Sequence, residues 1–190
     1  MYFPLMVQLE AKRAVVIGGG AVALRKCALL LDFGARVTAV APAFDAGFDM
    51  LPDISCIRDC YMPRYLAQAE IVIAASDDRE INRAVSVFCR ENRIPVNVVD
   101  DPELCSFIVP AVLRRGDLTL AVSTGGKSPA TAGRIKRELA EHYGVDWEER
   151  LTLLGEIRED ILRSDLPPAE KRRRIVESTD LEIEALRAML

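Results

Sequence analysis

The sequence predicts an α/β protein built on a doubly wound parallel sheet, and three observations support this prediction. A short apolar run at residues 14–17 ends in three consecutive glycines. Strand-like and helix-like apolar segments then alternate as far as residue 99, as they do in parallel α/β sheets. Beyond residue 106 the alternation stops, and a predicted hairpin precedes several helices. We therefore expect a Rossmann-type sheet, then a small β-hairpin and helical region, then a C-terminal helical tail.

The strands of the first half are short and almost wholly apolar, which is typical of strands buried on both faces. We expect them at residues 14–17, 36–40, 54–58, 71–75 and 96–99. The helix after the first strand should end at Gly34. Its apolar residues recur on one face: Ala23, Cys27, Leu30 and Leu31. A second helix should carry an apolar stripe from Ile81 to Cys89, with residues 76–78 as possible caps at its start.

The second half is predicted to open with strands at residues 107–113 and 118–122, joined by a tight turn at residues 114–117. Ser128 followed by Pro129 indicates the start of a helix that should end near Gly144.

A further helix should begin at Asp146 with a capping box. Pro167 and Pro168 should interrupt the helices that finish the chain. We therefore divide the chain into residues 1–110, 111–145 and 146–190.

Composition excludes several classes of protein. The 190 residues contain no apolar run long enough to cross a bilayer and no signal peptide, so we expect a cytoplasmic protein without a membrane partner. A net charge of −4 argues against nucleic-acid binding. The five cysteines form no CxxC pair, and Cys27 and Cys89 should be buried as small apolar residues. Since His142 is the single histidine, we expect no metal site, and we interpret it as a buried or capping residue.

The glycine-rich loop is the first candidate site. Residues 18–23 fit the pattern GxGxxA, between a predicted strand and a predicted helix. In that pattern Gly18 permits the tight turn, Gly20 lets the backbone approach a pyrophosphate, and Ala23 allows close packing of helix and strand. Free amides at the helix start then face the phosphates. The alternative is a glycine-rich turn without a ligand.

The second strand lacks the carboxylate that usually binds a ribose hydroxyl, because residues 40–43 are Val-Ala-Pro-Ala. A preference between NAD and NADP is therefore not predicted from these residues.

Two carboxylates, Asp100 and Asp101, follow the last predicted parallel strand. Ligands of open α/β sheets bind beyond the carboxyl ends of the strands. Asp100 can thus face the nicotinamide cleft as a general base or as a metal-associated carboxylate. An Asp-Pro turn with only a structural role is an equally good interpretation of the residues alone.

Residues 107–137 are basic in an otherwise acidic chain, which indicates a local anionic ligand or, equally well, a solvated face. The bases are Arg114, Arg115, Lys127, Arg134, Lys136 and Arg137, against the single acid Asp117. Residues 125–128 are not a Walker A motif, because Ala121 stands where that motif needs glycine. They can still bind an anion at a helix start.

Taken together, these segments resemble the precorrin-2 dehydrogenase family of sirohaem synthesis, which includes the N-terminal module of sirohaem synthase. The segments are residues 16–26, 74–78, 97–100, 106–110 and 121–129, in the family's order and at its spacing. The resemblance implies NAD-dependent oxidation of precorrin-2 to sirohydrochlorin. It also implies a homodimer in which the region after the Rossmann domain is the dimerisation and substrate-cleft region.

The resemblance also assigns residues to roles. Cofactor contacts would fall on Gly20, Ala21, Val22, Pro42, Ala43, Ser76 and Asp77, together with Gly18 of the motif. The catalytic aspartate would be Asp100. Ser123, Thr124 and Gly125 would lie by the substrate, where the basic residues Lys127 and Arg114 would attract the carboxylates of the tetrapyrrole.

Three alternatives stay open. Some members of the family also insert iron into sirohydrochlorin, and chelation at Asp100 would make this chain bifunctional. A non-catalytic NAD-sensing module would share the glycine loop but would not need Asp100 or the basic segment. Another small NAD-linked oxidoreductase is disfavoured, because no tyrosine has lysine four positions later.

Overall fold

The computed structural model describes residues 2–190. The chain forms two compact units, one comprising the residues up to Val109 and the other Pro110–Leu190. The finer division at residue 146 stays a prediction.

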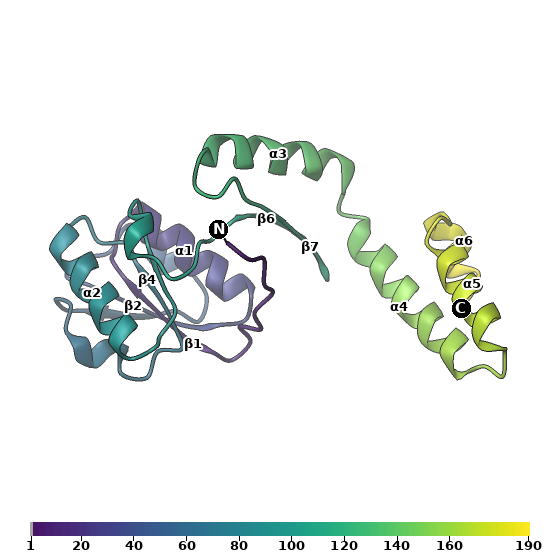
Figure 1. The fold of residues 1–190 in the computed structure, drawn as a ribbon, viewed down its shortest axis with the longest axis horizontal. Helices are drawn as coiled ribbons and strands as arrows, with labels where there is room; N and C mark the ends of the chain where they lie inside the picture. The colour runs from purple at the N-terminus through teal and green to yellow at the C-terminus, as the bar shows by residue number, and fades with distance from the viewer. Residues whose placement is uncertain (1) are drawn as a thin grey trace. The chain divides into compact units, whose positions relative to one another are not determined.

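The first unit is a five-stranded parallel sheet, as predicted (Figure 1). Its strands follow the order β3-β2-β1-β4-β5, so the chain reverses its direction of travel between β1 and β4. Doubly wound sheets bind ligands at the carboxyl ends of the two strands that flank such a reversal. The strands are β1 (Arg13–Ile17), β2 (Arg36–Ala41), β3 (Ser55–Arg58), β4 (Ile71–Ala74) and β5 (Val96–Val98).

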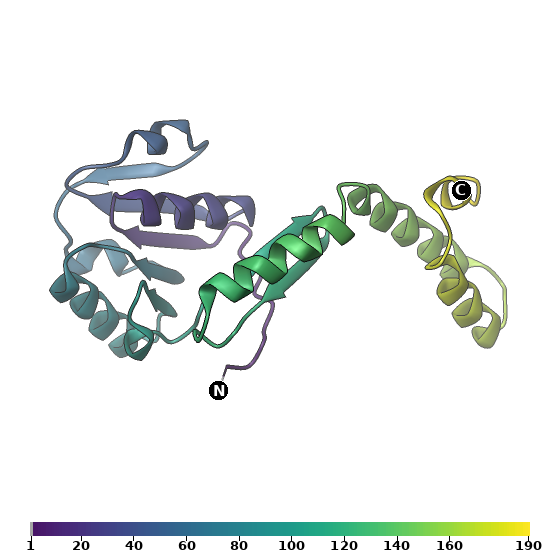
Figure 2. The same ribbon diagram turned by 90° about the horizontal axis from the view of Figure 1, so that it is seen from above.

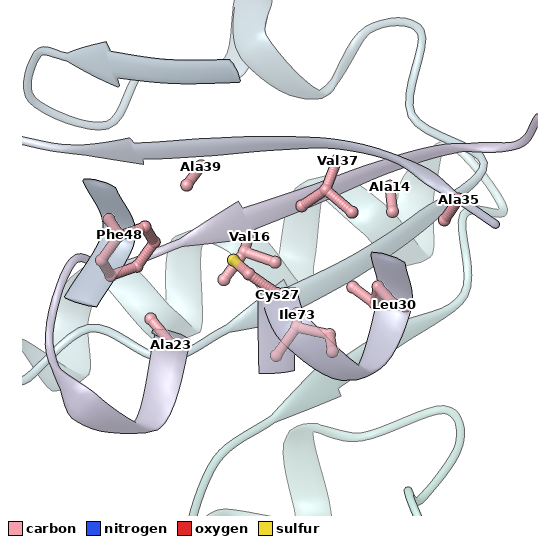
Figure 3. Close-up of a cluster of buried hydrophobic side chains, with 10 residues drawn as sticks. All are labelled: Ala14, Val16, Ala23, Cys27, Leu30, Ala35, Val37, Ala39, Phe48 and Ile73. Atoms are coloured by element: carbon pink, nitrogen blue, oxygen red, sulfur yellow. The ribbon is translucent and has the colours of Figure 1, made fainter. Parts of the chain in front are cut away.

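Two long helices cover the two faces of this sheet (Figure 1). Helix α1 (Ala21–Asp32) packs on one face, where Cys27 lies against Val16 and Ile73 (Figure 3). Helix α2 (Arg79–Glu91) packs on the other face through Val85 and Cys89. Three short 3₁₀ helices complete the unit: η1 (Ala46–Met50), η2 (Pro63–Leu66) and η3 (Pro102–Leu104).

Cys27 and Cys89 are fully buried, which confirms the prediction for both residues. Burial raises the pKa of the Cys27 thiol to about 12 and that of Cys89 to about 11. Both side chains therefore act as small apolar residues of the core.

The second unit starts with an antiparallel hairpin of β6 (Ala111–Arg115) and β7 (Leu118–Val122). Helix α3 (Pro129–His142) lies along this hairpin and buries Leu113 and Ala132 (Figure 2). As predicted, the Ser128 hydroxyl caps α3 by accepting a hydrogen bond from the amide of Thr131 (3.3 Å), and Pro129 occupies the first helical position. The remaining helices are α4 (Trp147–Arg163), α5 (Pro168–Ser178) and α6 (Ile183–Arg187), whose core includes Ile157, Ile161 and Leu186.

The first hairpin strand differs from the prediction, since it begins at Ala111 rather than at residue 107 and continues to Arg115. The reason is that the preceding residues are tied to β5. The amide of Ser106 donates to the carbonyl of Val96 (2.8 Å), and the Asn97 side chain donates to the carbonyl of Phe107 (3.1 Å).

In the second unit, the capping box predicted at Asp146 is absent, and the buried alternative for His142 is wrong, although His142 does lie in the last turn of α3. Asp146 stands at the start of α4, but its side chain caps no backbone amide. His142 is exposed rather than buried, and its ring packs edge-on against Tyr143, with 4.9 Å between the ring centroids. None of the helices formed by residues 2–190 has the length and apolar character needed to span a membrane.

Candidate cofactor and substrate sites

Gly18 and Gly19 follow β1 and pack closely against the loops that follow β4 and β2. Gly18 has a φ of +136°, and a Cβ there would overlap the carbonyl oxygen of Ala75. A Cβ on Gly19 would overlap the carbonyl oxygen of Ala43. Both positions therefore need glycine for the packing of the protein itself.

Gly20 differs from its two neighbours. Its φ of −86° suits any residue, and a Cβ there would meet nothing within 4 Å. Gly20 is the N-cap residue of helix α1 and has no side chain that could accept a hydrogen bond. The backbone amides of the first turn, including those of Ala21 and Val22, are therefore not capped by Gly20. Open space in front of uncapped amides fits the close approach of a pyrophosphate, so the residues present suit a dinucleotide.

The predicted contact residues Pro42, Ala43, Ser76 and Asp77 lie on neighbouring loops at the same edge of the sheet. Pro42 and Ala43 follow β2 and are exposed. Ser76 and Asp77 follow β4, where the Ser76 hydroxyl accepts a hydrogen bond from the amide of Asp78 (3.2 Å). Parallel topology thus brings all eight predicted cofactor residues to the carboxyl ends of β1, β2 and β4.

Asn82, to which the sequence motifs assign no role, holds the loop after β4. Its side-chain oxygen accepts from the Ser76 amide (3.1 Å), and its side-chain nitrogen donates to the Ser76 carbonyl (2.8 Å). Asn82 is buried on the same helical face as Val85 and Cys89. A polar residue at an apolar-face position was therefore the signal that could have identified it.

Asp100 follows β5 at the same edge of the sheet. Its side chain is exposed, and its φ of +59° is uncommon for a residue other than glycine. The Cys105 thiol holds the segment after it by accepting from the Val98 amide (3.1 Å). Burial raises the pKa of this thiol, which keeps it protonated within hydrogen-bond distance of the carbonyls of Val98 and Asp101.

Lys26 on α1 is a half-buried cation whose charge interacts with Asp100. Burial lowers the pKa of Lys26, and the nearby Arg25 lowers it further, whereas Asp100 raises it. Lys26 had no predicted role, because this interaction depends on how α1 packs against the sheet.

The predicted substrate residues lie in the second unit, and four of them share one loop. This loop, residues 123–127, connects β7 to α3. The Ser123 hydroxyl accepts from the Gly125 amide (3.1 Å), and the Thr124 hydroxyl accepts from the Ser128 amide (3.0 Å). Lys127 is exposed, and the region around Gly125 is open, so the loop can contact a ligand.

Arg114 lies at the other end of the hairpin. It pairs with Thr119 beside the turn, and its guanidinium donates to the carbonyl of Gly116 (3.1 Å). Ser123 is four positions after Thr119, which corresponds to roughly 13 Å along an extended chain. Arg114 therefore does not join the loop of residues 123–127 within this unit. Across residues 2–190, no group of three or more His, Cys, Asp or Glu side chains is arranged to hold a metal ion.

Comparison with known proteins identifies the family. Residues 5–111 match the family model described as putative NAD(P)-binding. The chain belongs to this family. Residues 115–142 match a second model, described as the central part of a sirohaem biosynthesis protein.

Similar proteins agree with these matches. Siroheme synthase of Thioalkalivibrio sulfidiphilus is 41% identical over 185 residues, which are 93% of this chain and 36% of the relative. Siroheme synthase of Methylococcus capsulatus is 38% identical and covers 94% of this chain. The chain spans only 38% of that relative's length.

A solved structure described as SirC, precorrin-2 dehydrogenase, matches with a TM-score of 0.79 and 26% identity. The match covers 99% of this chain and 96% of that one. The resemblance predicted from the sequence motifs is thus confirmed.

Proposed function

We propose that this chain oxidises precorrin-2 to sirohydrochlorin with NAD as the hydride acceptor. The observation that carries the proposal is the open space at Gly20 in front of the uncapped start of α1. The likeness to SirC along 99% of the chain supports the choice of substrate.

The cofactor would bind along the carboxyl edge of the sheet. The backbone at Gly20, Ala21 and Val22 would hold its pyrophosphate, because amides at a helix start favour negative charge. Pro42 and Ala43 would contact one end of the dinucleotide, while Ser76 and Asp77 would contact the other. When bound, the nicotinamide ring accepts a hydride from the substrate.

Asp100 would accept the proton that accompanies this hydride. Oxidation of precorrin-2 removes two hydrogens, one as a hydride to the cofactor and one as a proton, so a nearby base assists the reaction. The exposed carboxylate of Asp100 is suited to this role.

The loop of residues 123–127 would bind the tetrapyrrole through its carboxylates. Its hydroxyl groups at Ser123 and Thr124 each keep one hydrogen to donate, and Lys127 supplies positive charge. Arg114, at the other end of the hairpin, would attract a different carboxylate of the same polyanionic substrate.

A homodimer is part of the proposal. The hairpin of the second unit has only two strands, so β6 and β7 each present an unpaired edge within this chain. A second copy would cover such an edge. Light scattering coupled to gel filtration should give twice the mass of one chain. We also propose a cytoplasmic location, because all five cysteines are free thiols, as in reducing compartments.

The test is anaerobic incubation of the protein with precorrin-2 and NAD, while sirohydrochlorin and NADH are followed by absorbance. We expect the two products to appear together in a one-to-one ratio. NAD binding without turnover would instead identify a non-catalytic NAD-sensing module. A second reaction with sirohydrochlorin and Co²⁺ tests whether the chain is bifunctional.

A further inference from the structure

A pocket of about 310 Å³ lies on the sheet face opposite α1, against β1 and β2. One side is formed by residues near the amino ends of these strands, including Arg13, Arg36 and Thr38, and the other by η2 and the residues after it. Arg13 is four strand residues from Ile17, or roughly 13 Å along β1. The pocket is therefore separate from the glycine loop.

The pocket carries an excess of positive charge. Arg13 and Arg36 are direct neighbours in the pairing of β1 with β2, and both line the pocket. Like charges at one position of neighbouring strands destabilise a sheet unless another charge offsets them. Arg64 contributes a third guanidinium from η2.

Two carboxylates near the pocket, Glu70 and Asp59, form ion pairs with Lys12, Arg13 and Arg64, but neither pairs with Arg36. Glu70 forms its short ion pair with Lys12 (2.8 Å) and lies 4.0 Å from the Arg13 guanidinium, which donates instead to the carbonyl of Gln68 (2.7 Å).

Asp59 pairs with Arg64 (3.3 Å). Within the part of the chain that the structure describes, Arg36 has no hydrogen bond or ion pair through its side chain.

The rest of the lining is suited to an organic molecule. Val15 and Ile57 of the sheet, with Ala69 and the Tyr65 ring opposite, supply apolar surface, while Thr38 contributes a hydroxyl. Guanidinium groups beside apolar side chains suit a small organic molecule that carries carboxylate or phosphate oxygens.

We infer that this pocket, which we call the arginine pocket, binds a small organic anion through Arg36, Arg13 and Arg64. The ligand class is a compact polycarboxylate or phosphate ester, and its binding offsets the repulsion between Arg13 and Arg36. The inference does not depend on the proposed dehydrogenase activity, because the arginine pocket lies away from the cofactor edge.

The test is isothermal titration of the full chain, without NAD, with citrate and separately with inorganic phosphate at constant ionic strength. We expect saturable binding of at least one of these anions, and the stronger of the two identifies the preferred oxyanion. The variant Arg36→Gln should weaken that binding about tenfold or more, since a hydrogen bond to a charged group contributes roughly 1.5–3 kcal/mol. The matched control Arg83→Gln, on the exposed side of α2, should bind as the wild type does.

Thermal unfolding distinguishes loss of the site from loss of the fold. Without the anion, Arg36→Gln should unfold at the wild-type temperature or above it, because the substitution removes the repulsion with Arg13. With the anion, only proteins with an intact site should be stabilised in a concentration-dependent way. Absence of saturable binding to the wild type, or equal weakening by Arg36→Gln and Arg83→Gln, would overturn the inference.

Discussion

Alanine substitutions at Gly19 and Gly20 should separate folding from cofactor binding, although the two residues are adjacent. A Cβ at Gly20 meets nothing in the protein within 4 Å, so Gly20→Ala should fold normally. The new methyl group would occupy the space in front of the α1 amides and keep a pyrophosphate away from them. Gly19→Ala should instead disturb the fold, because its Cβ would overlap the Ala43 carbonyl oxygen and lie 2.9 Å from the Ala41 side chain.

The magnitudes follow from these contacts. Alanine is a poorer residue than glycine at a helix N-cap, so Gly20→Ala should cost at most about 1 kcal/mol of folding free energy. Loss of one charge-assisted hydrogen bond to the pyrophosphate should weaken NAD binding by about 10- to 150-fold. Overpacking against rigid backbone at Gly19 should cost about 1–3 kcal/mol or more.

Two measurements test this pair of variants. Urea unfolding gives the free energy of unfolding for each variant, and fluorescence titration gives the dissociation constant for NAD. Wild-type NAD affinity in Gly20→Ala would refute the assignment of the glycine loop to a pyrophosphate. Equal loss of stability in the two variants would show that the contacts of Gly19 and Gly20 are not as different as the structure implies.

Three further predictions concern other parts of the first unit. Asp100→Ala should lower turnover about 10²- to 10⁴-fold while leaving the NAD dissociation constant unchanged, and unaltered turnover would remove Asp100 from the mechanism. Asn82→Ala should cost about 1–3 kcal/mol in urea unfolding, because it leaves both backbone groups of Ser76 without their partner; a loss well below this range would contradict that role. At pH 8 the exposed Cys60 should react rapidly with a disulfide reagent, whereas Cys27, whose pKa is about 12, should react only after unfolding; Cys60→Ser should abolish the rapid phase.

The alternation of strands and helices in the first unit was predictable because buried parallel strands are continuous apolar runs. The strand expected at residues 14–17 is Arg13–Ile17, and the strand expected at residues 36–40 is Arg36–Ala41. The start of the hairpin was not predictable in this way. Phe107, where the predicted strand begins, is apolar, but its carbonyl and the amide of Ser106 form hydrogen bonds with β5, which belongs to the other sheet.

The placement of the glycine loop and of Asp100 was predictable, because each directly follows an apolar strand; their roles stay predictions. Asn82, Lys26 and Cys105 were not predicted, since their roles arise from contacts between elements. These side chains contact the loops that carry the predicted site residues. Sequence spacing alone does not indicate which loop such a side chain will contact.

The two hydrogen bonds between Asn82 and Ser76, one donated by each residue, limit how the loop after β4 can recognise a ligand. The Ser76 amide already donates a hydrogen bond to the Asn82 side chain, and the Ser76 hydroxyl oxygen already accepts one from the Asp78 amide. The hydroxyl hydrogen is therefore the donor that Ser76 has left to offer. Ser76 can therefore donate this hydrogen to a lone pair of a ligand, such as that of a ribose oxygen or a carboxamide carbonyl.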